Sequence, residues 1–231
     1  MTRRRVVLSW SGGKDSALAL QALRADPTVE VAALLTSVTR DYDRVSIHGV
    51  RRTLLERQAR RLGLPLLTIE LDPATTNDRY QDAFLEALER VARELPDVSA
   101  IAFGDLFLAD VRAYREKLLE GTGFEPLFPL WGLDTAELAR KFVRDGFVAR
   151  LVCVDTTQLD GAFAQRHFDD ALLAELPPSV DPCGERGEFH TFVSYGPGYD
   201  GPVEYTVGEV VVRDERFAFA DLIPEESAPT R

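Results

Sequence analysis

The first half of the chain alternates short apolar runs with segments in which apolar residues recur every three or four positions. The runs typical of buried strands lie at residues 6–8, 30–38, 66–71 and 99–103. The segments with helical spacing lie at residues 16–23, 48–62 and 77–95. Continuous apolar runs are typical of strands covered on both faces, and helical spacing indicates one buried stripe on each helix. The alternation predicts an α/β fold with a doubly wound parallel sheet, in which ligands bind at the carboxyl ends of the strands.

The second half has a less regular pattern, which predicts a smaller α+β domain. Its helical segments lie at residues 135–144 and 165–176, and its strand-like runs at 147–154, 188–193 and 203–213. Prolines and a glycine punctuate the connection before the first of these helices. We therefore place a boundary at Leu130, with domains over 1–130 and 131–231, and leave open whether the halves share one sheet. The tail from Ile223 is rich in proline and glutamate, and we expect it to be frayed.

Composition narrows the class of protein. The net charge is −11 and the sequence pI is about 4.8, which argues against broad electrostatic binding to nucleic acid. Five arginines on the 48–62 segment are expected to form a solvated face instead; they are Arg51, Arg52, Arg57, Arg60 and Arg61. No apolar stretch reaches the roughly 20 residues of a membrane span. With no export signal evident, we expect a cytoplasmic protein without a membrane partner.

The densest motif is Ser11-Gly12-Gly13-Lys14-Asp15-Ser16, between the first strand and the first helix. Glycines allow a ligand to approach the backbone, and the free N–H groups and dipole of a helix N-terminus attract anions. The hydroxyls of Ser11 and Ser16 and the charge of Lys14 would add to such a site. The spacing matches neither a Walker A loop nor a dinucleotide fingerprint. The alternative is an ordinary glycine–serine turn that binds nothing.

Asp15 of this motif and two residues further along the first half are candidates for the same ligand site at the strand ends. Asp15 would suit a Mg²⁺ ion that bridges phosphates, although the helix dipole alone favours an acidic residue there. Asp105, after Gly104 and the fourth strand, could hold ribose, metal or acceptor, or could simply cap the next helix. Arg115 could stabilise phosphate charge or form a surface ion pair.

A second dense motif runs from Asp181 to Val193. If residues 188–193 form a strand, Glu188, His190 and Phe192 share one face, so a carboxylate and an imidazole lie within reach of each other. His190 could then carry a proton near neutral pH, and Glu185 and Glu188 could hold ammonium or accept its protons. The alternative is a structural hydrogen bond between Glu188 and His190 at a sheet edge. Cys183 and Cys153 are expected to be small buried residues, and two cysteines are too few for a disulfide framework or a zinc site.

Together these segments resemble the diphthine–ammonia ligase family of N-type ATP pyrophosphatases. The segments that carry the resemblance are the 11–16 loop, His48-Gly49-Val50, residues 104–107, 128–132 and 152–155, and residues 184–193. The sequence departs from the family pattern at two positions. Arg186 stands where these enzymes have a glycine, and His190 stands where an acidic residue is usual.

The resemblance implies that ATP and Mg²⁺ are used to adenylate a carboxylate, which ammonia then converts to an amide. The implied nucleotide-binding residues are Ser11, Gly12, Gly13, Lys14, Asp15, Ser16 and Gly104, with Asp15 on the metal. The implied catalytic residues are Lys14, Asp15, Asp105, Glu188 and His190. Arg115, Glu185, Glu188 and His190 are implied to bind substrate. The acceptor would be diphthine on elongation factor 2 in an archaeon or a eukaryote.

Two other functions stay open. One is a different adenylating enzyme, such as a tRNA-modifying one, although no basic RNA-binding domain or catalytic cysteine pair is evident. The other is a sensor that binds ATP or AMP without turnover. The oligomeric state is also left open, with a homodimer among the options.

Overall fold

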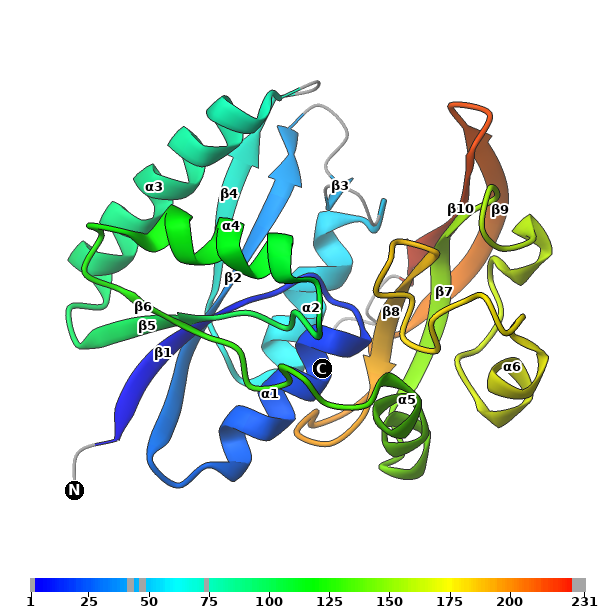
Figure 1. Ribbon diagram of the computed structural model, residues 1–231, viewed down its shortest axis with the longest axis horizontal. Helices are drawn as coiled ribbons and strands as arrows, with labels where there is room; N and C mark the ends of the chain where they lie inside the picture. The colour runs from blue at the N-terminus through cyan, green and yellow to red at the C-terminus, as the bar shows by residue number, and fades with distance from the viewer. Residues whose placement is uncertain (1–2, 41–43, 46–48, 73–74, 226–231) are drawn as a thin grey trace, which may run out of the picture.

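The computed structural model describes residues 3–40, 44–45, 49–72 and 75–225, which form two sheets with flanking helices (Figure 1). In the first sheet the described parallel strands are ordered β4-β2-β1-β5-β6, and the short β3 pairs antiparallel with the end of β2. The bounds of these strands are β1 Arg4–Ser9, β2 Val29–Thr39, β3 Arg44–Val45, β4 Leu66–Leu71, β5 Val98–Ala102 and β6 Glu125–Leu127.

Helices cover both faces of this sheet, as the sequence predicted. They are α1 Lys14–Ala25, α2 Arg52–Leu62, α3 Asn77–Glu94 and α4 Ala109–Leu119. Successive residues of a strand face opposite sides, so Val6 and Leu8 pack with α1 and α2 while Val7 packs with α3 and α4. The parallel, doubly wound architecture is therefore confirmed.

The second sheet is separate and antiparallel, in the order β8-β7-β10-β9. Its strands are β7 Val148–Asp155, β8 Phe189–Tyr195, β9 Tyr205–Arg213 and β10 Phe217–Pro224. The helices of this half are α5 Thr135–Arg144 and α6 Asp170–Glu175, with a short 3-10 turn at Gly161–Phe163. The two halves thus do not share a sheet.

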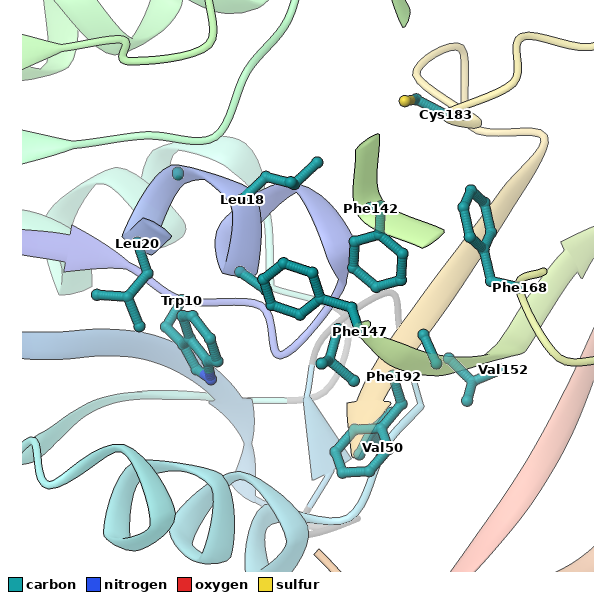
Figure 2. Packing of buried hydrophobic residues seen from close by; sticks show 14 of the residues in the cluster. Trp10, Leu18, Leu20, Val50, Phe142, Phe147, Val152, Phe168, Cys183 and Phe192 are labelled. Carbon is teal, nitrogen blue, oxygen red and sulfur yellow. The ribbon is translucent and has the colours of Figure 1, made fainter. Parts of the chain in front are cut away.

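One hydrophobic core joins the halves. Phe142, Phe147 and Phe192 from the second half belong to the same buried cluster as Leu18 of α1 (Figure 2). Phe142 and Phe147 stack with ring centroids 4.7 Å apart. Because α1 is packed between the first sheet and β8, its N-terminus lies against residues of both halves.

Polar contacts reinforce this junction, and several come from the arginines of α2. Arg51 pairs with Asp221 at 2.7 Å, and Arg61 lies 3.4 Å from Asp200. Arg57 donates to the Glu204 carbonyl. Arg60 and Arg61 are exposed, as expected of a solvated face, and the contacts add partners from the C-terminal half that the sequence did not predict.

Two expectations were wrong. The 165–176 segment is helical only over α6, because residues 165–168 instead pair with β7: Gln165 donates to the Leu151 carbonyl and Leu151 donates to the Arg166 carbonyl. Gln165 also has a positive φ of 70°. The tail was expected to fray from Ile223, but Ile223 and Pro224 are the end of β10 and pair with β9, while residues 226–231 of the tail lie outside the described residues. His48 of the predicted 48–62 helix lies outside the described residues, and α2 begins at Arg52.

Within the part of the chain that the structure describes, no helix has both the length and the apolar composition needed to cross a membrane.

Candidate active site at the glycine loop

The 11–16 loop forms a tight turn between β1 and α1. Gly12 adopts a φ of +78°, which favours glycine. Its added Cβ would also lie 2.7 Å from Gln58 Oε1. The Gly13 amide donates to Ser11 Oγ, and Ser16 Oγ donates to the Gly13 carbonyl. Gly13 is the N-cap of α1 and has no side chain with which to cap the helix. The N-terminus of a helix is suited to bind an anion.

The loop is held by the second half of the chain. The Lys14 amide donates to Thr191 Oγ1 at 3.0 Å, and the Val193 amide donates to the Gly12 carbonyl at 2.9 Å. Gln58, which is fully buried, donates through Nε2 to the carbonyls of Gly12 and Val193. Its Oε1 accepts from Trp10 Nε1. Strand β8 is thus part of the wall that shapes the loop.

Sequence reasoning missed Gln58. The available signal was a glutamine on the buried stripe of α2, between Leu54, Leu55 and Leu62. A buried amide needs several partners, so its presence on an apolar stripe indicates a polar connection.

The loop opens into a cavity of about 260 Å³ at the carboxyl ends of β1 and β5. Of the residues predicted for the site, the cavity is lined by Ser11, Gly13, Lys14, Asp15, Ser16, Gly104, Asp105, Arg115, Glu185 and His190. Residues 11–16 and 184–191, which lie far apart in the sequence, therefore meet at this cavity. Gly12 and Glu188 are not among the lining residues.

Gly104 permits the close approach of two of these segments. A Cβ at this position would lie 3.0 Å from the Asp15 carbonyl carbon and 3.2 Å from the Ser16 nitrogen. Both neighbours are backbone atoms of the first turn of α1, which cannot rotate away as a side chain can. The absent side chain allows the loop after β5 to lie against the helix N-terminus.

The buried Lys14 and the partly exposed Asp15 form an ion pair in this cavity. Lys14 is 2% exposed, and its Nζ lies 2.7 Å from Asp15 Oδ1 and 5.7 Å from the centroid of the Phe189 ring. Burial disfavours the charged ammonium, but Asp15, together with Cys183 and Glu185, outweighs burial and raises the pKa of Lys14. Burial also raises the pKa of Asp15, against the opposing effect of Lys14. The ammonium is therefore charged, and a ligand phosphate would compete with Asp15 for it.

Asp105 and Arg115 form a second, looser pair. Arg115 Nε lies 3.8 Å from Asp105 Oδ2, and both buried atoms lack a hydrogen-bond partner within the described residues. Burial raises the pKa of Asp105, partly offset by Arg115. The alternative role of Asp105 as a helix cap is wrong, since α4 has Leu108 as its N-cap. Buried polar groups without partners cost free energy, so this pair is available to a ligand.

Arg112, one turn before Arg115, is directed differently. It pairs with Glu116 at 2.7 Å and stacks its guanidinium on Trp131, 4.8 Å from the ring centroid. It does not line the cavity. Of the two arginines on this helix face, Arg115 is the one that reaches the cavity.

Glu185 and His190 supply the titratable groups from the second half. Glu185 Oε1 accepts from the Leu106 amide at 2.8 Å, and burial raises the pKa of Glu185 to about 7. Burial, together with the charge of Lys14, lowers the pKa of His190 to about 4. The imidazole is then neutral at neutral pH. A proton carrier works best with a pKa near the working pH, and of these two groups Glu185 has the pKa nearer to neutral.

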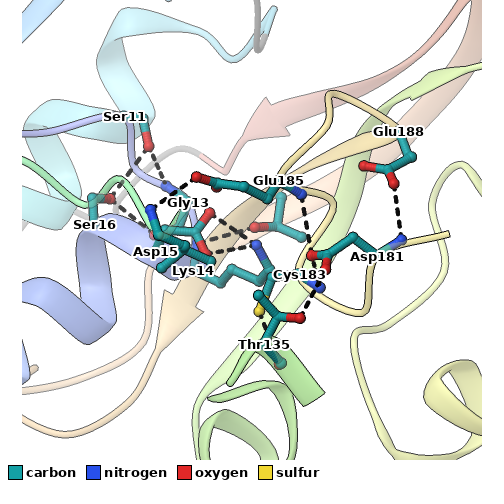
Figure 3. Close-up of polar contacts among 12 residues, drawn as sticks. Ser11, Gly13, Lys14, Asp15, Ser16, Thr135, Asp181, Cys183, Glu185 and Glu188 are labelled. Atoms are coloured by element: carbon teal, nitrogen blue, oxygen red, sulfur yellow. Dashed lines mark hydrogen bonds and ion pairs between the residues drawn. The ribbon is translucent and has the colours of Figure 1, made fainter. Parts of the chain in front are cut away.

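Glu188 departs from its predicted position. It precedes β8 and is 1% exposed, and its Oε1 accepts from the Asp181 amide (Figure 3). Its Oε2 accepts from the Arg186 amide. Both carboxylate oxygens thus bind the backbone of the 181–186 loop rather than facing the cavity beside His190. The expectation of a face shared with His190 was wrong, because β8 begins only at Phe189 and two loop amides bind the Glu188 carboxylate.

The two cysteines are small buried residues, as expected. Cys183 is 1% exposed, and its thiol donates to the Thr135 carbonyl. Burial raises the pKa of both thiols to about 12, so neither is a thiolate at neutral pH.

A glycine loop between the first strand and the first helix of a parallel sheet, with a lysine and serines at the cavity, defines an α/β protein with a candidate anion-binding site. Residues 4–126 match the family model described as the diphthamide synthase N-terminal domain, and residues 134–216 match its C-terminal domain. The chain belongs to the diphthamide synthase family.

A curated relative carries the name diphthine–ammonia ligase, from Schizosaccharomyces pombe. It is 26% identical over 217 residues, which cover 87% of this chain but 36% of the relative. The chain therefore spans about a third of the length of this relative. A solved structure, the U34-tRNA thiolase NcsA from Methanococcus maripaludis with its [4Fe-4S] cluster, matches with a TM-score of 0.38 and 17% identity. That match covers 60% of this chain and 56% of the thiolase chain.

Proposed function

We propose that the protein is an ATP-dependent ligase that adenylates a carboxylate and transfers ammonia to it, as the name of the yeast relative suggests. The observation that carries the proposal is that the 11–16 loop, Arg115 and Glu185 line one and the same cavity. The loop suits the phosphates of a nucleoside triphosphate. Arg115 suits a charged acceptor, and Glu185 suits an amine. The acceptor is diphthine if the host makes it.

The 11–16 loop would hold the phosphates. The hydroxyls of Ser11 and Ser16 and the α1 N-terminus offer donors, and the Lys14 ammonium would neutralise charge on departing pyrophosphate. Mg²⁺ is bound in such sites by one or two carboxylates together with substrate phosphates. Asp15 and Asp105 both line the cavity, and Asp105 Oδ2 lacks a hydrogen-bond partner. These two carboxylates fit the ion, which would supply charge neutralisation on the phosphates.

The reaction then has two displacements. An acceptor carboxylate oxygen, positioned by Arg115, attacks the α-phosphorus, and the bond from that phosphorus to pyrophosphate breaks. Ammonia attacks the acyl carbon of the resulting acyl-adenylate, and the bond to AMP breaks, which leaves an amide. Ammonia is mostly ammonium at neutral pH, so one proton must be removed before attack and one afterwards. Glu185 can accept a proton, and neutral His190 can accept or donate a hydrogen bond to the amine.

The direct test measures AMP and pyrophosphate release from ATP with Mg²⁺, with and without ammonium, across carboxylate acceptors that include diphthine-bearing elongation factor 2. We expect both products only when an acceptor is present, and amide formation only with ammonium. Tight binding of ATP without turnover on elongation factor 2 or on other carboxylates would contradict the ligase and favour a nucleotide sensor. Release of sulfur- or nitrogen-modified tRNA would favour the other adenylating enzymes.

The pKa of Glu185 predicts a pH dependence. Only the ionised carboxylate accepts a proton, so kcat/KM, corrected for the fraction of unprotonated ammonia, should rise with pH and level off above about 7. Replacing Glu185 with Gln should remove this limb and lower the plateau by about 10²-fold. Glu116→Gln, at a carboxylate of α4 that does not line the cavity, serves as the control and should keep the parent profile. An unchanged limb in Glu185→Gln would assign the titration to another group.

A further inference from the structure

Strand β9 is an open edge of the second sheet and is apolar on both of its faces. It pairs with β10 on one side, and no other described strand pairs with it. Val210, Val211 and Val212 are 41%, 47% and 58% exposed, although neighbouring residues of a strand face opposite sides. In Figure 1, the β9–β10 hairpin extends beyond the rest of the second sheet. Exposed apolar edge strands are templates for pairing with another strand.

The backbone of β9 has groups directed away from β10. The Arg213 carbonyl accepts from the Arg216 amide across the hairpin turn, so the Arg213 backbone faces β10. The N–H and C=O groups of alternate residues point to opposite edges of a strand. Val212 and Val210 therefore direct their backbone groups to the open edge.

Two charges flank the valines, and neither is neutralised within the chain. Among the described residues, Glu209 and Arg213 form no ion pair with each other or with another residue. The guanidinium of Arg213 lies over the Phe219 ring, 5.8 Å from its centroid. Glu209, Val211 and Arg213 alternate along the strand and share a face.

These charges make the strand complementary to itself. We propose that β9 pairs antiparallel with β9 of a second copy of this chain, around a twofold axis at Val211. In that register Glu209 lies opposite the other copy's Arg213, twice, and Val210 lies opposite Val212 of the other copy. The two edge-directed residues then exchange backbone hydrogen bonds, and the two sheets become continuous.

Other registers are less favourable. Residues opposite each other must face the same side of the sheet, so the register shifts in steps that keep this parity. Centring the pair at Val212 places Glu209 opposite Glu215, and centring it at Glu209 or Arg213 places identical charges together. Centring it at Val210 leaves both charges opposite valines. The charge pattern therefore selects Val211 as the centre.

Cysteine cross-linking tests the register in the full-length protein. Across an antiparallel pair, opposite Cβ atoms lie about 4.5–5.5 Å apart, so Val211→Cys should form an intermolecular disulfide under mild oxidation. Val207→Cys is the matched control, because Val207 is a similarly exposed valine of the same strand but would lie far from its own copy. The native cysteines are buried and do not interfere. Equal cross-linking of both variants, or none with Val211→Cys, would overturn the proposal.

Charge reversal tests the same pairing without new bonds. Sedimentation velocity should show a reversible dimer that is weakened about tenfold by Glu209→Arg or by Arg213→Glu. The double variant restores opposite charges across the axis and should regain the parent affinity. A protein that stays monomeric from low to high micromolar concentration, or a double variant weaker than both single variants, contradicts the pairing. Circular dichroism checks that each surface variant remains folded.

Discussion

Replacing Lys14 with Ala should reduce acceptor-dependent pyrophosphate release by at least about 10²–10³-fold, the range seen when one preorganised donor to a developing charge is removed. The ammonium is almost completely buried beside the phosphate loop, where the shortage of water makes each charge more effective. It would meet the negative charge that grows on pyrophosphate as the α-phosphorus bond breaks. No other lysine lines the cavity within the described residues.

The matched control is Lys117→Ala, since Lys117 is an exposed lysine on α4 without a described ion pair. Its turnover should equal that of the parent protein. Thermal unfolding of both variants separates a loss of chemistry from a loss of fold, which matters because Lys14→Ala also leaves Asp15 without its partner. Parent-like turnover in Lys14→Ala, with the fold intact, would contradict the assignment of the 11–16 loop.

Gly104→Ala should lower both stability and turnover. The added methyl would meet the Asp15 carbonyl carbon at 3.0 Å, so either the loop after β5 or the first turn of α1 must move. Overpacking of this kind costs about 1–3 kcal/mol. A displacement of about 1 Å between the phosphate loop and Asp105 would reduce turnover by roughly 10²-fold. The measurements are the free energy of unfolding in urea and kcat at saturating ATP.

Gly161→Ala provides the comparison. A Cβ at Gly161 would meet its nearest atom, a side-chain methyl of Thr156, at 3.4 Å, and its φ is not positive. The same chemical change should therefore alter neither stability nor turnover appreciably. If Gly104→Ala behaves like Gly161→Ala, the close approach at the helix N-terminus does not constrain the site.

The parts of the site that sequence predicted well are short and contiguous. Six consecutive residues at a strand–helix junction contain both the turn and the groups that line the cavity, so local spacing is enough to recognise the Ser11–Ser16 loop. Asp105 and Arg115 were harder, because each had an equally plausible local role. The N-cap at Leu108 rules out the capping role of Asp105, and both residues line the cavity, while their roles toward a ligand stay predictions.

The errors came from hydrogen bonds that the spacing of apolar and polar residues does not reveal. Glu188 was placed on a strand face by alternation, but the amides of Asp181 and Arg186 hold its carboxylate. Residues 165–168 have helical spacing, yet their backbone pairs with β7. In both cases a tertiary hydrogen bond overrides a local preference, because a buried polar group left without a partner costs more free energy than a propensity provides.

The sequence by itself determined the alternating strands and helices of the first half and the glycine loop at residues 11–16, because these depend on residues close together along the chain. It also determined the acidic net charge and the lack of a long apolar stretch. Only the tertiary structure decided that β8 holds this loop through Thr191, Val193 and the buried Gln58. It also decided the surroundings of the titratable groups at the cavity: burial raises the pKa of Glu185 and lowers that of His190. Burial and charge at one cavity depend on every segment that surrounds it, and no local pattern contains that sum.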